Sequence, residues 1–208
     1  MARGLFITVE GVDGCGKTTQ AARIAAALEA SGHDVLRLRE PGGVAISEKI
    51  RGILLDPAHG EMGDACELLL YEAARAQLVH EVIAPALAAG KTVVCDRFYD
   101  STTAYQAYAN GFDLESVKRA NALAVGECRP DVTLVFDVDV DVAAARRHGR
   151  DAADRLELKG LEYQRRVARG FRAIAAEEPR RVRVVDASRG IDEVFASAWQ
   201  VVVSCVER

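Results

Sequence analysis

The chain has 208 residues, half of them hydrophobic, and its 27 Lys+Arg and 31 Asp+Glu residues leave a formal net charge of −4. This length suits one globular domain, and the mild acidity argues against nucleic acid or an anionic membrane as the main partner, since such binding relies on clustered cationic charge. No apolar run is long enough for a membrane helix, and the first residues enter a strand pattern directly, so we expect neither a membrane anchor nor a signal peptide.

Strand and helix patterns alternate along the chain. A strand at 5–10 leads through a glycine loop to a helix at 18–30, a strand at 35–39, helices at 46–55 and 64–89, and a strand at 92–95. Helices at 101–109 and 114–125, a strand at 132–138, a helix at 140–147 and a charged, mobile loop at 148–155 follow. The chain then continues with a helix at 157–178, a strand at 182–186 and a helix at 191–206.

This alternation predicts an α/β fold, in which a five-stranded parallel sheet of the P-loop NTPase type is flanked by helices on both faces. We expect one domain over residues 1–208, with a mobile lid at about 147–156. Ligands should bind beyond the carboxyl ends of the strands. The five cysteines form no CxxC pair, so we expect no zinc site and no disulfide framework, but reduced thiols in the cytoplasm.

The loop after the first strand is suited to holding phosphate. Its sequence, Gly11-Val12-Asp13-Gly14-Cys15-Gly16-Lys17-Thr18, fits the pattern G-x-x-x-x-G-K-[ST] between a strand and a helix. Lys17 should reach the β- and γ-phosphates of a nucleotide, and Thr18 should ligate Mg²⁺. The alternative is an ordinary glycine turn. No Asn-Lys-x-Asp follows a strand, which disfavours a guanine-binding switch protein.

A second anion site is predicted beyond the third strand. There Asp96 could hold Mg²⁺ through water, and Arg97 could grip a phosphate with two hydrogen bonds. The alternative is a surface ion pair. Arg39, at the end of the second strand, and Arg51, on the following helix, could join the same cleft.

Two groups of side chains could bind a base and a sugar. Tyr71 and Arg75 lie four residues apart on one helix face, where the ring could stack on a base and the guanidinium could bond its edge. A core tyrosine beside a solvated arginine is equally consistent with this spacing. Ser101, Thr102 and Tyr105 could bond a base or crowd a sugar, although Ser101 could instead cap a helix.

Four arginines in one segment could stabilise a transferring phosphoryl group. The glycine loop has no arginine of its own, and transfer spreads negative charge that an arginine from a closing loop would stabilise. The candidates are Arg146, Arg147, Arg150 and Arg155, and their spacing does not choose among them. A solvated charged loop is the alternative.

Taken together, these motifs resemble the thymidylate kinase family, from Phe6 to about Val201. The matching motifs are Leu38-Arg39-Glu40-Pro41-Gly42-Gly43, Tyr71-Glu72-Ala73-Ala74-Arg75-Ala76-Gln77-Leu78, Asp96-Arg97-Phe98, Ser101 to Gln106, Arg129-Pro130-Asp131 and Asp154-Arg155-Leu156-Glu157. Phe98 departs from the family's more usual tyrosine or histidine, and Thr102 occupies a position that varies among members.

The resemblance implies ATP-dependent phosphorylation of dTMP to dTDP, with Mg²⁺, by a homodimer that packs helices from the middle of the chain. It implies ATP binding by Gly11 to Thr19 (Gly11, Val12, Asp13, Gly14, Cys15, Gly16, Lys17, Thr18 and Thr19) and by Arg146. It implies dTMP binding by Asp13, Arg39, Arg51, Tyr71, Arg75, Arg97, Ser101, Thr102 and Tyr105. It implies Mg²⁺ binding by Thr18 and Asp96, and catalysis by Lys17, Asp96, Arg97, Arg147 and Arg150.

Within these roles, Asp13 would bind the 3′-hydroxyl of dTMP, and Tyr105 near C2′ would disfavour ribose. Two rival functions are open at this point. One is a kinase for another nucleotide or for a deoxynucleoside. The other is a nucleotide-dependent switch or regulatory ATPase, which would hydrolyse ATP without an acceptor.

Overall fold

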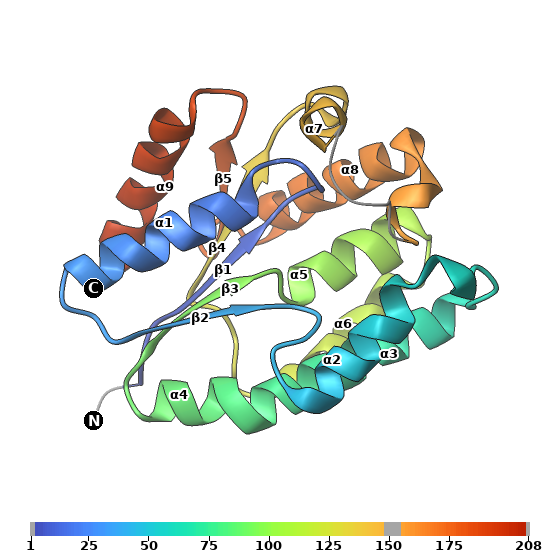
Figure 1. Cartoon of the computed structure of the whole chain (residues 1–208), viewed down its shortest axis with the longest axis horizontal. Coiled ribbons are helices and arrows are strands. Elements are labelled where there is room, and N and C mark those ends of the chain that lie inside the picture. Colours follow the sequence, from blue (N-terminus) through green and yellow to red (C-terminus); the bar gives the residue numbers. More distant parts are fainter. Residues whose placement is uncertain (1–2, 148–154, 207–208) are drawn as a thin grey trace.

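Five parallel strands form the centre of the molecule (Figure 1). The computed structural model describes residues 3–147 and 155–206. Within these residues the strands are β1 (Phe6–Glu10), β2 (Val35–Arg39), β3 (Thr92–Asp96), β4 (Val132–Asp137) and β5 (Val182–Asp186), in the sheet order β2-β3-β1-β4-β5. All neighbouring pairs are parallel, so the carboxyl ends meet at one edge. The predicted fold class is confirmed.

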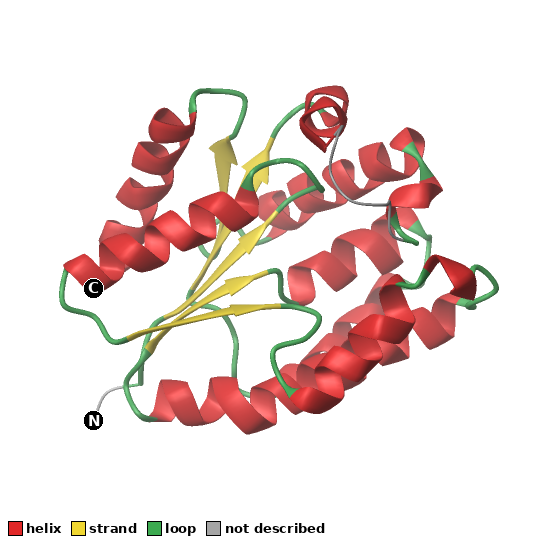
Figure 2. Ribbon diagram, in the orientation of Figure 1, coloured by secondary structure: helices red, strands yellow, loops and turns green. Residues whose placement is uncertain are grey.

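Helices cover both faces of the sheet (Figure 2). Helices α1 (Lys17–Ala30) and α9 (Ile191–Val206) contact each other and the sheet on one face. Helices α4 (Ala84–Ala88), α5 (Tyr99–Thr102), α6 (Leu114–Val125) and α8 (Leu161–Glu177) lie on the other face. Helices α2 (Ala45–Leu55), α3 (Asp64–Leu78) and α7 (Val140–Arg147) complete the set, with short 3₁₀ turns at Pro57–His59 and Glu157–Lys159.

The side chains of β1 show how the central strands are buried on both faces. Ile7 and Val9 belong to the larger apolar cluster, whereas Phe6 packs edge-on against Phe98 with ring centroids 4.9 Å apart. Successive side chains of a strand point to opposite faces. Glu10 therefore shares the face of Phe6, and its contacts with the chain after β3 follow from this position.

Two predicted helices are interrupted by π-helical segments. The run at 64–89 contains the π segment Val79–Ile83 between α3 and α4, and the run at 101–109 is α5 followed by the π segment Thr103–Ala109. Pro85 explains the first interruption, because proline lacks an N–H and its ring crowds the carbonyl four residues earlier. The predicted helix at 157–178 begins only at Leu161, since Gly160 adopts a positive φ of 84°.

No helix within the described ranges is long and apolar enough to cross a membrane. The predicted loop at 148–155 falls almost wholly on residues 148–154, which lie outside those ranges. Because the strands are parallel, their carboxyl ends form one edge of the sheet, and a ligand site is expected at that edge.

Candidate active site

The glycine loop runs from β1 into α1 and is closely packed against α7. Gly14 has a φ of 88°, and a Cβ atom there would lie 2.1 Å from the carbonyl oxygen of Ala143. The same Cβ would lie 3.0 Å from Cγ of Arg147. Glycine is therefore required at this position for conformation and for space. The last turn of α7 thus carries Arg147 beside the loop.

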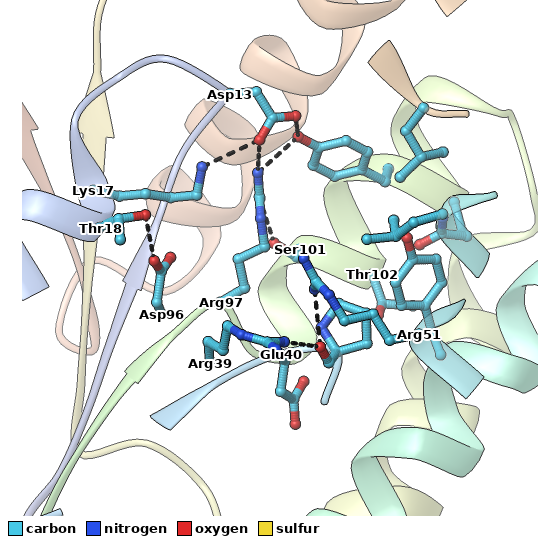
Figure 3. Close-up of a pocket in the computed structure, with 16 residues that line it drawn as sticks. Asp13, Lys17, Thr18, Arg39, Glu40, Arg51, Asp96, Arg97, Ser101 and Thr102 are labelled. Carbon is cyan, nitrogen blue, oxygen red and sulfur yellow. Dashed lines mark hydrogen bonds and ion pairs between the residues drawn. The ribbon is translucent and has the colours of Figure 1, made fainter. Parts of the chain in front are cut away.

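A cavity of about 240 Å³ opens at the carboxyl edge of the sheet, next to this loop (Figure 3). Its lining contains most of the predicted site residues: Asp13, Lys17, Thr18, Arg39, Arg51, Tyr71, Asp96, Arg97, Ser101, Thr102 and Tyr105. Other predicted nucleotide-binding residues form the loop and the first turn of α1 outside the lining: Gly11, Val12, Gly14, Cys15, Gly16 and Thr19.

Asp13 is the meeting point of three polar side chains in the cavity. Its Oδ1 accepts hydrogen bonds from Arg97 and, at 3.3 Å, from Nζ of Lys17. Its Oδ2 accepts the hydroxyl of Tyr105 at 3.2 Å. Burial opposes ionisation, but the charges of Arg97 and Lys17 hold the pKa of Asp13 well below its usual range. Asp13 is therefore a carboxylate flanked by two cations.

Arg97 follows β3 with a φ of 71°, an uncommon backbone conformation for a residue with a side chain. Its Nη1 donates to the carbonyl of Gly11 at 3.1 Å and to Oγ of Ser101 at 3.0 Å. Its Nη2 lies 3.3 Å from the hydroxyl of Tyr105. The guanidinium is thus fixed between the glycine loop and the turn after β3.

Thr18 and Asp96 face each other across the start of α1 and the end of β3. The hydroxyl of Thr18 donates to Oδ2 of Asp96 at 2.6 Å. The other oxygen, Oδ1, is buried without a hydrogen-bond partner among the described residues. A buried carboxylate oxygen usually has a partner, so this pair has unused capacity for a cation or a water molecule.

Arg39 and Arg51 hold the turn that follows β2. Their guanidiniums donate to the carbonyl of Pro41 at 2.8 and 2.9 Å. Arg39 also pairs with Glu48 at 3.0 Å. Both arginines lie at the edge of the cavity, as predicted, and they fix the shape of the turn there.

The structure separates the predicted pair of Tyr71 and Arg75. Tyr71 lines the cavity, whereas Arg75 is not among its described lining residues and is 2% exposed. Nε of Arg75 donates to Glu40 at 2.8 Å, and Nη1 donates to Glu72 at 2.6 Å. Burial opposes its charge, but Glu40 and Glu72 raise the pKa of Arg75, so it stays a cation behind the cavity wall.

The arginines of the predicted lid occupy different places. Arg146 donates to the carbonyl of Ala187, after β5, at 3.0 Å. Arg155 is 7% exposed, donates to the carbonyl of Leu54 at 2.9 Å, and pairs with Glu67 at 2.5 Å. Arg155 therefore ties the chain to α2 and α3 rather than facing the glycine loop. Arg150 lies outside the described residues.

Several residues without a predicted role also line the cavity: Leu55, Glu40, Pro41, Gln106 and Leu156. Leu55 follows Arg51 by four residues on α2, and this spacing was the available signal for it. Gln106 donates to the buried Glu67 at 2.7 Å, and Leu156 follows Arg155, which pairs with the same carboxylate. Glu67 thus joins two parts of the cavity wall.

A phosphate-binding loop and a second cluster of arginines converge on one cavity of a parallel α/β sheet. This arrangement defines a P-loop phosphotransferase that holds two anionic substrates side by side.

Comparison with known proteins specifies the family. A family model described as thymidylate kinase matches residues 9–198. The thymidylate kinase of Syntrophotalea carbinolica is 48% identical over 200 residues, covering 93% of each chain, and that of Geobacter sulfurreducens is 45% identical over 211 residues, covering 99% of each. The crystal structure of thymidylate kinase from Ehrlichia chaffeensis superposes with a TM-score of 0.76 at 35% identity, covering 96% of this chain and 99% of the other. The chain belongs to the thymidylate kinase family.

Proposed function

We propose that the chain transfers the γ-phosphoryl group of ATP to the phosphate of dTMP, giving dTDP and ADP, within this cavity. The observation that carries the proposal is the convergence of Lys17 and Arg97 on one oxygen of Asp13. Lys17 belongs to the loop that would hold ATP, and Arg97 belongs to the second anion site. Two phosphates bound by these cations would be neighbours, as in-line transfer requires.

On the acceptor side, Arg97 holds the phosphate of dTMP with help from Arg39 or Arg51. Asp13 accepts the 3′-hydroxyl, and Tyr71 stacks on thymine. Ser101, Thr102 and Tyr105 line the sugar and the base, while Arg75 acts on the edge of the base. Arg75 lies behind the cavity wall and is hydrogen-bonded to Glu40, which lines the cavity. We therefore include this bond to Glu40 in the proposed role of Arg75.

On the donor side, Gly11 to Thr19 bind the phosphates of ATP through backbone N–H groups at the start of α1. Lys17 stabilises the transferring phosphoryl group. Arg146 borders the nucleotide, and Arg147 or Arg150 supplies the arginine that the glycine loop lacks. The closeness of Arg147 to Gly14 supports the first of these two.

Mg²⁺ fits the pair of Thr18 and Asp96. Their oxygens are the ligand type that this ion prefers, and Oδ1 of Asp96 is buried without a hydrogen-bond partner in the described part of the chain. No group of three or more His, Cys, Asp or Glu side chains placed to hold a metal occurs in that part. Thr18 would ligate the ion and Asp96 would hold it through water. When bound, Mg²⁺ would neutralise charge on the phosphates of ATP.

The residues of the cavity mainly position groups and stabilise charge. The acceptor is an ionised phosphate, so the reaction needs no strong general base. We propose that residues 1–208 form one domain; the predicted lid at about 147–156 falls largely on residues outside the described ranges. The location of the protein in the cytoplasm is a prediction that rests on its cysteines, all of which are free.

We further propose that the protein is a homodimer that packs through α2, α3 and α6. Helix α3 contacts both of the others. Leu69 on α3 and Leu123 on α6 are 64% and 88% exposed, and Ile53 on α2 is also exposed. Cys66 is exposed one turn before Leu69. Several apolar side chains on adjoining helices support an interface there.

The test is release of ADP with ATP, Mg²⁺ and a panel of acceptors: dTMP, dUMP, UMP, CMP, AMP, GMP and thymidine. We expect strong turnover with dTMP, weaker turnover with dUMP and none with thymidine. Chelation of Mg²⁺ should abolish turnover. Preference for another monophosphate would contradict the base pocket, and release of ADP that ignores every acceptor would contradict the second phosphate site.

A further inference from the structure

Glu10, the last residue of β1, is fully buried, and no role in the reaction has been given to it. It does not belong to the described lining of the cavity. A carboxylate is costly to bury unless several donors satisfy it. The partners of Glu10 therefore indicate why it is there.

Glu10 accepts three hydrogen bonds from the turn after β3. Its Oε1 accepts the backbone N–H of Phe98 at 2.7 Å and that of Ser101 at 3.2 Å. Its Oε2 accepts the hydroxyl of Ser101 at 2.6 Å. One carboxylate thus fixes the ends of the four-residue segment that follows Arg97.

Arg97 connects this turn to the cavity. Its φ of 71° is strained for arginine, and such a conformation persists only where the surroundings fix it. The backbone N–H of Arg97 donates to the carbonyl of Val9 at 2.9 Å, immediately before Glu10 in the strand. On the other side, Oγ of Ser101 accepts Nη1 of Arg97 at 3.0 Å. The end of β1 therefore holds both the backbone and the side chain of Arg97.

We propose that Glu10 is a positioning residue for the phosphate of the acceptor. It holds the turn after β3 so that Arg97 keeps its left-handed backbone and directs its guanidinium toward Asp13. The inference rests on the proposed function in one respect, because it takes Arg97 as the group that binds the acceptor phosphate.

Glu10→Gln tests this role, because it keeps the size of the side chain but places an N–H₂ group among donors. Its amide can serve the two backbone N–H groups or Oγ of Ser101, but it cannot accept from all three. We expect the KM and Kd for dTMP to rise about tenfold, as for a lost hydrogen bond to a charged group. The KM for ATP and the Kd for thymidine, which has no phosphate, should stay within about twofold on the same scale.

Thr8→Val is the matched control. Thr8 is buried on the same face of β1, but its hydroxyl is bonded to Thr133 at 2.7 Å and reaches the turn only through the bond of Thr133 to Asp100, not through Phe98 or Ser101. It should leave the ratio of dTMP to thymidine affinity unchanged. The inference is overturned if Glu10→Gln lowers the affinities for dTMP and thymidine equally. It is also overturned if Thr8→Val lowers the affinity for dTMP but not for thymidine.

Two further variants keep the test decisive. If Glu10→Gln does not fold, Ser101→Ala breaks the same connection with the loss of one hydroxyl, and it should again weaken dTMP selectively. Arg97→Lys separates the inference from the proposed function. If Arg97→Lys leaves the affinity for dTMP unchanged, the assigned role of Arg97 is wrong. If Arg97→Lys lowers the affinity for dTMP while Glu10→Gln and Ser101→Ala do not, only the positioning role of Glu10 is wrong.

Discussion

At the scale of single residues, Arg75 is a predicted binding residue whose contacts also hold the fold. It is paired with Glu40 in the turn after β2 and with Glu72 on its own helix. We expect Arg75→Ala to lower the free energy of unfolding by about 3–5 kcal/mol, because it leaves two carboxylates buried without a cation. It should also raise the KM for dTMP more than the KM for ATP.

Urea denaturation together with steady-state kinetics measures both effects. The double variant Arg75→Met with Glu40→Gln serves as the control, since it removes charge on both sides of the pair. It should recover part of the stability but not the use of dTMP. Equal losses for the two nucleotides in the folded enzyme would contradict a role at the edge of the base.

Glu10 gives a prediction for pH. Burial and then the charge of Asp100 raise the pKa of Glu10 to about 7, against the opposing effects of Arg97, Ser101 and the N–H of Phe98. Between its ordinary pKa of 4.5 and about 7, the folded state keeps a proton that the unfolded state releases. Stability therefore falls as pH rises through this window and levels off above it, and one group contributes about 3 kcal/mol over the window.

Comparison with Glu10→Gln isolates this contribution. From pH 5 to pH 8, the free energy of unfolding of the unaltered chain should fall relative to that of the variant. Parallel pH profiles for the two proteins would contradict the raised pKa.

The sequence identified most residues of the cavity but could not rank the arginines. Motif spacing places Arg97 at the end of a strand, where the parallel sheet brings it beside the glycine loop. Arg147 and Arg155 flank one charged segment and look alike in sequence. They differ through tertiary contacts, since Arg155 meets the buried Glu67 and Arg147 lies next to Gly14.

At the scale of elements, Arg181 joins the end of α8 to β5, β4 and α5. Its Nη1 and Nη2 donate to the two oxygens of the buried Asp100 at 2.6 and 2.8 Å, and Nη1 also donates to Thr133 at 2.8 Å. It pairs with Glu178 at 2.8 Å as well. Three segments that are distant in the sequence are thus held by one guanidinium.

We expect Arg181→Ala to cost about 3–5 kcal/mol of stability, because Asp100 would remain buried without its partner. Arg183→Ala, at an exposed position on β5, which begins one residue after Arg181, should change stability by no more than about 0.5 kcal/mol. Thermal and urea unfolding of the two variants provide the measurement. Similar stabilities for both would show that the network around Arg181 contributes little.

Strands and their order of appearance could be predicted because a parallel sheet buries short, continuous apolar runs. The π-helical segments could not, since a local i→i+5 hydrogen-bond pattern leaves apolar spacing almost unchanged. One of these segments, Thr103–Ala109, carries Tyr105 and Gln106 into the cavity. The spacing of apolar residues therefore could not predict the orientation of these two side chains.

At the scale of the whole molecule, the parallel sheet gathers into one cavity residues that lie far apart in the sequence. Asp13, Arg39 and Arg97 follow or end three different strands, and they meet because β2, β3 and β1 are neighbours. This part of the site follows from strand order. Other parts of the site depend on how α2, α3 and the chain after residue 155 pack. The spacing of residues in the sequence does not predict that packing.

The proposed homodimer is tested by a paired substitution at its exposed leucines. We expect Leu69→Glu with Leu123→Glu to weaken association at least about 100-fold, because each leucine contributes roughly 1.5–3 kcal/mol when buried. Sedimentation velocity over a range of concentrations measures this change. Ile191→Glu, at an exposed position on α9, is the control and should leave association unchanged. A monomeric unaltered chain at all concentrations would contradict the proposal.

The exposed Cys66 offers a way to observe this surface directly. Burial raises the pKa of Cys15 and Cys95, which makes their thiols poor nucleophiles, whereas Cys66 is open to solvent on α3. A maleimide dye should therefore attach to Cys66 before it reaches the glycine loop. Its attachment would slow as protein concentration rises if a second copy covers α3. The rate of labelling would then report association without any substitution in the cavity.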